Sequence, residues 1–312
     1  MQRIFSRAAT LLLLTLTLFS FAGSAFAESL PAVQTTVESA TVNLYCRIKT
    51  AGRTYSTTGS GVFVHESGVI LTNAHVAQYF LFATSTGRTK VRCSVRDGSP
   101  ARGHYSASLL YLSPSWAQAT VEATTKKQPR KGTGESDFAL LRVTKAEKGQ
   151  LPERFPSLPL EMGPAVLSDG DRVTVAGYPA EGLTFREVQN KLVVLTENLT
   201  ITSIQSFERP NKDLLILSPS AASASGISGG PIVGSSGGLI AIAFAVKEGT
   251  VSRDDRSLRA ITLLYIDRAL RVHTGRSLLD YISDMNLGGV DPALSPFSNL
   301  WRTVEKTLRN TR

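Results

Sequence analysis

Cysteine and histidine are scarce in this chain, and their scarcity limits the chemistry available to it. The sequence has two cysteines, Cys46 and Cys93, and four scattered histidines. Two cysteines cannot build a structural zinc site without histidines at suitable spacing, so we expect no metal centre and no cofactor. In an oxidising compartment we expect the two cysteines to form one disulfide, and two buried thiols are the alternative.

Long apolar runs are missing except at the beginning of the chain. Residues 1–27 have a basic start, an apolar run to Phe21, and a small-x-small pattern at Ala25–Ala27 that a signal peptidase cleaves. An uncleaved anchor is the alternative, but the run is shorter than the roughly 20 residues that span a bilayer. We therefore expect cleavage, export to the periplasm or the medium, and no stable membrane span afterwards.

Acidic residues are outnumbered by basic ones, and the formal net charge is +9. Such a charge attracts anionic surfaces, but it also simply keeps an exported protein soluble. No basic patch is interleaved with aromatic residues in the manner of nucleic-acid-binding segments. We therefore expect no nucleic-acid partner and attribute the charge to solubility.

Short apolar segments separated by Gly, Pro, Ser or Asp fill most of the chain. Their lengths are typical of strands, and the pattern favours antiparallel barrels or sandwiches over βαβ units. The predicted strands are Thr41–Lys49, Ser60–Val64, Val69–Thr72, Lys90–Val95, Tyr105–Leu112, Phe138–Val143, Arg172–Gly177, Lys191–Leu195, Asn198–Gln205, Leu214–Ser218, Pro231–Val233, Leu239–Val246 and Ala260–Tyr265.

A proline-rich stretch between Gly149 and Pro164 separates these strands into two similar groups and is expected to be a connector. We therefore divide the chain into five parts. They are a signal peptide (1–27), an N-terminal unit (28–150), the connector (151–166), a C-terminal unit (167–270) and a helical tail (271–312).

Two segments outside the strands are distinctive. Residues 117–136 are polar and basic, and we expect an exposed, mobile loop that could border a substrate cleft. Near the end, apolar residues recur at helical spacing from Phe297 to Leu308, after a Ser295–Pro296 pair typical of a helix start. We expect an amphipathic helix packed on the body, with a membrane-surface or partner helix as the alternative.

Three motifs place chemically useful side chains beside predicted strands. The first is a Gly-Ser-Gly strand over 59–64, followed by a turn and an apolar strand that leads into Thr-Asn-Ala-His at His75. The second opens an apolar strand with Asp137, and the third is the Gly-Ile-Ser-Gly-Gly-Pro segment around Ser228. Alone, each is ordinary: a core histidine, an acid at a strand start, a glycine-rich turn.

Together and in this order, the motifs resemble those of the trypsin-like serine endopeptidases, particularly the bacterial Deg/HtrA type. Residues 173–179 look like the family's strand at the start of its second barrel. The resemblance as a whole covers roughly residues 38–268. It implies the all-β chymotrypsin fold, with two antiparallel six-stranded β-barrels and the active site in the cleft between them. It also implies polypeptide substrates.

The resemblance assigns His75 as general base, Asp137 as the acid that orients it, and Ser228 as nucleophile. A serine hydroxyl needs a neighbouring imidazole to take its proton, and the acid stabilises the imidazolium that forms. The backbone N–H groups of Gly226 and Ser228 would form the oxyanion hole, because glycine permits the sharp bend. The expected substrate-binding residues are Ala222, Ala243, Phe244 and Ala245.

The chain departs from the family pattern in three respects. Ile227 stands where trypsin has the acid that pairs with a new N-terminus, so we expect no such activation. The stretch after Arg271 is too short for the PDZ domains that Deg/HtrA proteases usually append, so we expect a protease domain without them. Phe244 stands where the family often has a polar residue and is expected to narrow the primary pocket. With no acid at Ala222, we predict a small or medium apolar P1 residue.

Two other interpretations fit parts of the sequence. The segment 226–230 also matches the G-x-S-x-G elbow of α/β-hydrolases, and Asp267 and His273 follow it in the order that an esterase of that fold requires. That fold needs a helix directly after the serine and parallel βαβ units, and Gly229–Pro231 opposes the helix. A catalytically silent binding module of the protease fold is the other alternative, and it predicts a missing triad residue.

Overall fold

The computed structural model describes residues 30–50, 52–83, 89–128, 132–163, 167–244 and 256–310. The expected signal peptide and Ala245 lie outside these residues. Among the residues described, no helix is long and apolar enough to cross a membrane.

The strands form two sets, one before and one after the proline-rich stretch. The first set is β1 (Thr41–Lys49), β2 (Thr54–His65), β3 (Val69–Thr72), β4 (Lys90–Asp97), β5 (Arg102–Leu112) and β6 (Ala139–Ala146). The second set is β7 (Arg172–Gly177), β8 (Leu195–Gln205), β9 (Leu214–Pro219), β10 (Pro231–Val233), β11 (Leu239–Phe244) and β12 (Ser257–Thr262).

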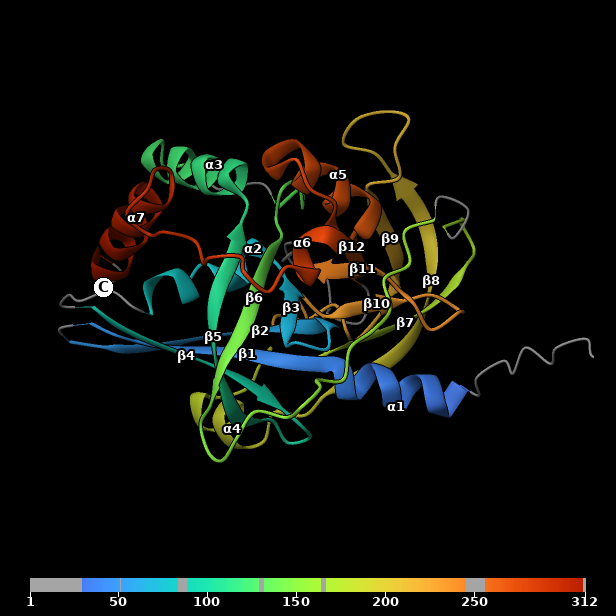
Figure 1. Cartoon of the computed structure of the whole chain (residues 1–312), viewed down its shortest axis with the longest axis horizontal. Coiled ribbons are helices and arrows are strands. Elements are labelled where there is room, and N and C mark those ends of the chain that lie inside the picture. Colours follow the sequence, from blue (N-terminus) through green and yellow to red (C-terminus); the bar gives the residue numbers. More distant parts are fainter. Residues whose placement is uncertain are drawn as a thin grey trace, which may run out of the picture.

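Each set closes into an antiparallel barrel, and both barrels have the same strand order (Figure 1). The first barrel runs β1-β2-β3-β6-β5-β4, and the second, in the same sense, runs β7-β8-β9-β12-β11-β10. The expected all-β chymotrypsin fold with two six-stranded barrels is therefore confirmed.

Helices cover the ends and flanks of the barrels. They are α1 (Leu30–Ala40), α2 (Ala74–Ala77), the 3-10 turn η1 (Phe80–Phe82), α3 (Pro114–Thr125), α4 (Phe185–Asn190), α5 (Leu263–Thr274), α6 (Leu278–Ser283) and α7 (Phe297–Asn310). Helices α3 and α7 lie side by side, α5 lies beside the second barrel, and α6 packs on α5 and against β2 of the first barrel (Figure 1).

The three largest clusters of buried apolar side chains among the described residues hold these elements together. One fills the first barrel and a second fills the second barrel. The third is shared, since it joins Val62 of β2 and Phe138 with Ile242 of β11, Val37 of α1 and Ile266 of α5. Burying each such side chain contributes about 1.5–3 kcal/mol, so the shared cluster fixes the two barrels against each other.

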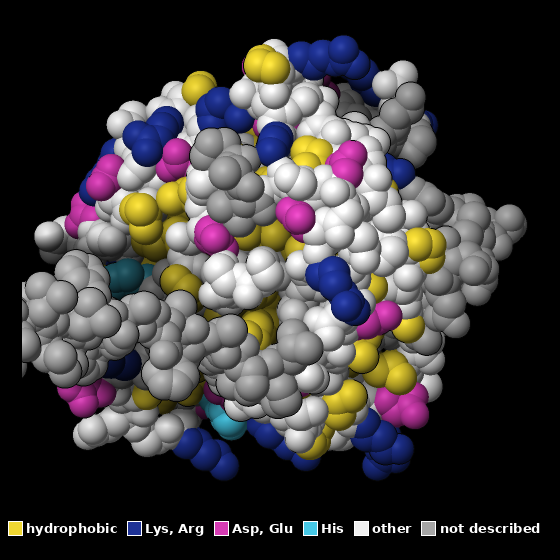
Figure 2. All heavy atoms as spheres, turned by 90° about the vertical axis from the view of Figure 1, so that its right-hand side faces the viewer, with side chains coloured by type: hydrophobic (Ala, Val, Ile, Leu, Met, Phe, Trp, Pro, Cys, Tyr) yellow, Lys and Arg dark blue, Asp and Glu magenta, His cyan; other side chains and the backbone are white. Residues whose placement is uncertain are grey.

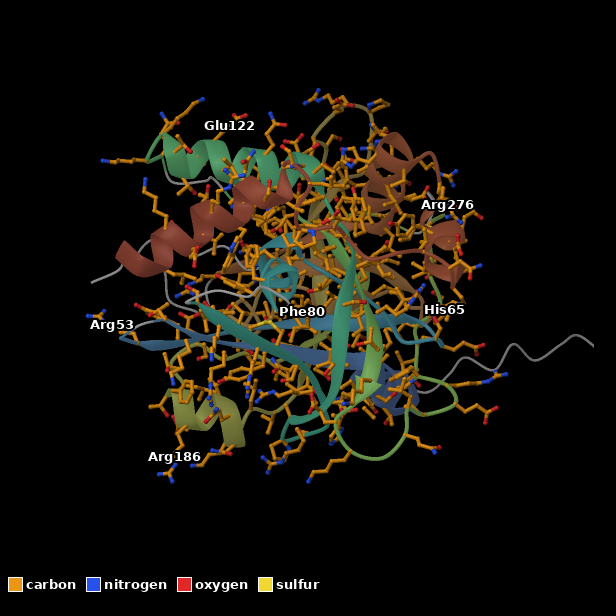
Figure 3. All side chains as sticks on the ribbon, turned by 60° about the vertical axis from the view of Figure 1, so that its left-hand side comes forward. Arg53, His65, Phe80, Glu122, Arg186 and Arg276 are labelled. Carbon is orange, nitrogen blue, oxygen red and sulfur yellow. A yellow bond between two sulfur atoms is a disulfide. The ribbon has the colours of Figure 1, made fainter. Side chains whose placement is uncertain are left out.

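Most charged side chains lie at the surface of this framework, whereas Arg96, Asp137 and Asp213 are buried. Arg53, Glu122 and Arg186 are exposed, whereas Phe80 is buried inside the first barrel's cluster (Figure 3). On the face shown in Figure 2, basic and acidic side chains are interspersed. The net positive charge is therefore not gathered into one patch on that face.

The two cysteines form a disulfide between neighbouring strands. Cys46 of β1 and Cys93 of β4 are register partners, with their Cα atoms 4.0 Å apart and their sulfurs bonded. The expected bridge is thus present, and the alternative of two thiols is wrong.

The expected loop over 117–136 is wrong in its first half, which is helical. Ser113 caps α3 by accepting a hydrogen bond from the Trp116 N–H (3.2 Å), and Pro114 occupies the first turn. Trp116 and Ala117 are buried and anchor the helix to the first barrel. Because these two buried residues are in the first turn and most of the residues after them are polar, the segment lacks the apolar periodicity that would predict a helix.

The expected C-terminal helix is confirmed as α7. Leu300 is fully buried, and the rings of Trp301 and Phe82 lie 4.4 Å apart between centroids. The helix therefore packs on the first barrel through its apolar face.

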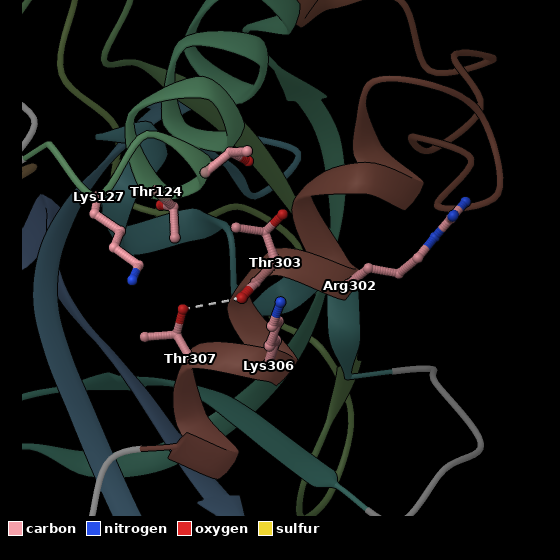
Figure 4. Close-up of a pocket in the computed structure, with 7 residues that line it drawn as sticks. Thr124, Lys127, Arg302, Thr303, Lys306 and Thr307 are labelled. Atoms are coloured by element: carbon pink, nitrogen blue, oxygen red, sulfur yellow. Dashed lines mark hydrogen bonds between the residues drawn. The ribbon is translucent and has the colours of Figure 1, made fainter.

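A groove of about 540 Å³ lies between α3 and α7 (Figure 4). It is lined by Thr124, Thr125, Lys127, Arg302, Thr303, Lys306 and Thr307. Hydroxyls of Thr124, Thr125 and Thr307 donate to carbonyls of their own helices, so these groups are already committed.

Two predicted strands differ from the observed elements. Residues 191–194 follow α4 and are not strand, because the apolar Leu192 is buried in a small cluster with Tyr178 rather than paired in a ladder. β12 ends at Thr262, whose hydroxyl accepts from the Tyr265 N–H (3.2 Å) and begins α5. In the second place a helix-capping threonine outweighs the apolar pattern.

Candidate active site

His75 and Asp137 meet because their elements are neighbours in the first barrel. His75 lies in α2, directly after β3, and Asp137 lies just before β6, which pairs with β3 through Thr72 and Ala139. The Asp137 Oδ1 accepts from the His75 backbone N–H (2.9 Å), and Oδ2 lies 2.7 Å from His75 Nδ1. The Asn73 side-chain amide donates to the Asp137 carbonyl (2.9 Å), which fixes the acid from a second side.

This contact determines what the imidazole can do. The Asp137 side chain is only 12% exposed, whereas that of His75 is 40% exposed. An ionised carboxylate at Nδ1 favours the tautomer with the proton on Nδ1, which leaves the basic lone pair on Nε2. The pair is thus arranged to accept a proton at Nε2 and to stabilise the resulting cation.

Ser228 lies in a bend between β9 and β10 that only glycine can make. Gly226 and Gly229 have φ values of +104° and +88°. A Cβ on Gly226 would lie 2.4 Å from the Tyr178 carbonyl oxygen, and one on Gly229 would lie 2.1 Å from that of Ser60. Side chains are excluded at both positions, so the sequence Gly-x-Ser-Gly serves the geometry of this bend.

Ser60 of β2 joins the serine loop to the first barrel. Its backbone N–H donates to the Ser228 carbonyl (2.8 Å), and its hydroxyl donates to the Gly226 carbonyl (2.7 Å). The same hydroxyl accepts from the Tyr178 N–H (2.8 Å). Thr72, at the end of β3, donates to the Ser60 carbonyl (2.7 Å). The loop of Ser228 is therefore seated against β2, the strand that pairs with β3, after which His75 follows.

The sequence did not single out Ser60 as a site residue. Ser60 belongs to the first motif, but its contacts with Gly226 and Ser228 join the two barrels and produce no pattern in the sequence near Ser60. The available signal was its place in the Gly-Ser-Gly strand of the first motif.

The expected oxyanion hole depends on the same bend. Donors aimed at a developing oxyanion must be held rigidly before the reaction. The peptide that carries the Gly226 N–H is held through the Ser225 carbonyl, which accepts from the Ala180 N–H (2.7 Å), and the next peptide is held through the bond from the Ser60 hydroxyl to the Gly226 carbonyl. The Gly229 N–H donates to the Ala243 carbonyl (2.8 Å) and holds the other side of the bend. The role of the Gly226 and Ser228 N–H groups stays a prediction.

The expected substrate-binding residues do not share one environment. Ala222 and Ala243 are buried in the second barrel's cluster, whereas Phe244 belongs to the shared cluster. The Phe244 ring faces Gly134, where an added Cβ would lie 2.6 Å from it. Ala245 lies outside the described residues. The substrate-binding roles of these residues stay predictions.

An ion pair that the sequence did not predict lies beside the serine loop. The Glu181 carboxylate bonds Arg256 at 3.1 Å and accepts from the Ser225 N–H (3.2 Å). The positive charge of Arg256 is thus balanced by Glu181, next to the residue that precedes Gly226.

The residues that an esterase would need have other contacts. Asp267 accepts from the Leu278 N–H (2.7 Å) and pairs with Arg271. His273 Nδ1 lies 2.6 Å from the Tyr111 hydroxyl, and burial lowers its pKa. With two antiparallel barrels in place of βαβ units, the α/β-hydrolase interpretation is wrong.

Within the part of the chain that the structure describes, no group of three or more His, Cys, Asp or Glu side chains is placed to hold a metal ion.

One family of known proteins matches this chain. Residues 59–242, which include His75, Asp137 and Ser228, match the family model described as a trypsin-like peptidase domain. No curated protein sequence matches the chain. Among solved structures, the chain is similar to the crystal structure of the active form of the Rv3671c protease from M. tuberculosis. The TM-score is 0.48 and the identity 18%, over 84% of this chain and 86% of that one.

Proposed function

The chain belongs to the family of trypsin-like peptidases, and from this we propose that it is a serine endopeptidase that cleaves polypeptides through His75, Asp137 and Ser228. The observation that carries the proposal is the contact between His75 Nδ1 and the Asp137 carboxylate at 2.7 Å. The seating of the Ser228 loop against β2 supports it further.

In the proposed reaction, Ser228 Oγ attacks the carbonyl carbon of the scissile bond while His75 Nε2 takes the hydroxyl proton. The tetrahedral intermediate carries an oxyanion, which the Gly226 and Ser228 N–H groups would stabilise, each by about 3 kcal/mol. As the C–N bond breaks, His75 returns the proton to the leaving amine and an acyl-enzyme remains. Water, deprotonated by His75, then releases the acid product and restores the serine.

The nucleophile is tested with a fluorophosphonate probe on the mature protein. We expect labelling of the wild type and none of Ser228→Ala, with a fall in kcat on the order of 10⁵- to 10⁶-fold. Ser225→Ala, an exposed serine of the same loop, is the control and should be labelled normally. A folded wild type that is neither labelled nor able to cleave casein would favour the silent binding module instead.

We also propose a preference for a small or medium apolar P1 residue. The buried Ala222 brings no charge to the expected pocket, and Arg256 is paired with Glu181. A peptide-library profile of the mature enzyme should therefore be enriched in small or medium apolar residues at P1. A dominant lysine, arginine or glutamate would contradict this preference without touching the assignment of Ser228.

We further propose export with cleavage after Ala27. The basic, apolar and small-x-small sequence at the N-terminus supports it, as does the Cys46–Cys93 disulfide, since such bonds persist in oxidising compartments. The mass of the protein recovered from its native host should correspond to a chain that begins at Glu28. A mass that retains the first residues would contradict cleavage.

A further inference from the structure

The turn that presents Asp137 has an unusual backbone. Ser136, directly before the acid, has a φ of +58°, a left-handed conformation that residues with a side chain rarely adopt. Gly134 has a φ of +86°, and its carbonyl accepts from the Asp137 N–H (3.1 Å). The Ser136 carbonyl accepts from the Phe138 N–H (3.0 Å). The direction of the Asp137 side chain therefore depends on a turn that needs support to persist.

The support comes from Tyr265, which follows Ser228 in the chain. Its hydroxyl accepts from the Ser136 N–H (2.9 Å) and lies 3.3 Å from the Ser136 hydroxyl. Tyr265 is buried in the first turn of α5, and its ring makes edge-to-face contacts with the rings of Phe138 and Phe207. Burial is the largest influence on this phenol and raises its pKa, so the hydroxyl stays neutral.

A second contact reaches the same turn from the second barrel. The Phe244 ring, at the end of β11, packs against Gly134 so closely that no side chain fits there. The turn between Gly134 and Asp137 is thus held by two side chains from chain segments beyond the serine loop. None of the three catalytic motifs contains either residue.

We propose that Tyr265 is a positioning residue for Asp137. Its hydroxyl holds the left-handed Ser136 turn, and through it the carboxylate that orients His75. Since Tyr265 and Ser228 both belong to the second half of the chain, docking of the two barrels completes the acid–base pair. This inference rests on the proposed function and adds a residue to it.

The test is Tyr265→Phe, which keeps the ring and removes the hydroxyl. A displaced carboxylate stabilises the imidazolium less, so the pKa of His75 should fall and the acidic limb of the kcat/KM profile should move to lower pH. We expect kcat to fall by roughly 10- to 100-fold, the range that a small misplacement causes, with KM within about twofold. Histidine-labelled NMR titration, assigned with His75→Ala, measures the pKa of His75 without relying on turnover.

A rescue variant separates positioning from general stabilisation. Glycine adopts a positive φ without strain, so Ser136→Gly in the Tyr265→Phe background should restore most of kcat and the pKa of His75. Glu135 and Asp213 are the charged groups that influence the Tyr265 hydroxyl, and Arg268 lies over the Tyr265 ring; these variants leave all three unchanged. Tyr281→Phe is the matched control, because this buried tyrosine of the same cluster donates to the Leu110 carbonyl (3.3 Å), away from the turn.

Each outcome decides the proposal. A folded Tyr265→Phe protein with unchanged kcat and unchanged pKa of His75 would overturn it, as would a loss that Ser136→Gly does not relieve. A Tyr265→Phe protein that does not fold would overturn it too, since the hydroxyl would then be a structural support. If the wild type proves inactive, the proposed function fails, and the NMR titration still tests the positioning.

Discussion

A single buried hydroxyl, that of Ser60, connects the parts of the candidate site. It bonds the peptide before Tyr178 and the carbonyl of Gly226, while the Ser60 backbone bonds Ser228. Because Ser60 is fully buried, each of these groups lacks water as an alternative partner. The position of the serine loop therefore depends in part on this side chain of the first barrel.

Removing this hydroxyl should impair both stability and turnover. Ser60→Ala leaves the Tyr178 N–H and the Gly226 carbonyl without their partner, which should lower the free energy of unfolding by roughly 1–3 kcal/mol. Without the bond to its carbonyl, Gly226 should hold the bend around Ser228 less rigidly, so we expect kcat to fall more than KM rises. Urea unfolding and steady-state kinetics measure the two effects. Ser56→Ala, exposed on the same strand, should match the wild type, and equal kinetics for both variants would contradict the assigned role.

Among the elements, β1 depends on more than its ladder hydrogen bonds. It pairs with β2 and β4 and is bonded covalently to β4 through Cys46 and Cys93. The bond closes a loop with a sequence separation of 47, which includes the strand that leads to His75. Such a link restricts the unfolded chain and so favours the folded barrel.

The disulfide should contribute measurably to the first barrel. In Cys46→Ala/Cys93→Ala we expect the free energy of unfolding to fall by roughly 2–4 kcal/mol. Urea unfolding with and without a reductant measures this, and the wild type should lose about as much on reduction as it does in the double variant. Identical curves for the oxidised and reduced wild type would show that the bond adds nothing.

At the scale of the whole molecule, the two barrels share one apolar cluster as well as the candidate site. Side chains of β2, β11, α1 and α5 meet in it, so neither barrel can open without exposing the other. The site residues follow the same division, with His75 and Asp137 in one half and Ser228 and Tyr265 in the other.

The barrels should therefore unfold together. Both tryptophans, Trp116 and Trp301, pack on the first barrel, so tryptophan fluorescence reports on that half alone. Far-UV circular dichroism reports on the strands of both halves. We expect the two signals to give the same urea midpoint, as in a two-state transition. Separate midpoints would mean that the shared cluster does not couple the barrels.

The sequence by itself determined the strand pattern, the amphipathic α7 and the motifs around His75, Asp137 and Ser228. Each of these features depends on residues only a few positions apart, so alternation of apolar residues, turn glycines and short motifs are enough to predict it. It missed α1, α2, α3 and α4, placed a strand over residues 191–194, which are not strand, and extended the last strand beyond Thr262 into α5. In α3 and α4 a cap and a few buried side chains outweighed the polar or apolar pattern of the segment.

Only the tertiary structure decided which distant residues support the site. Ser60 meets Gly226 across 166 residues, and Ser136 meets Tyr265 across 129. Ring contacts and buried hydrogen bonds of this kind arise when the barrels dock, and they leave no local periodicity in either segment. The sequence therefore supplied the reactive groups, whereas packing between the barrels determined what holds them in place.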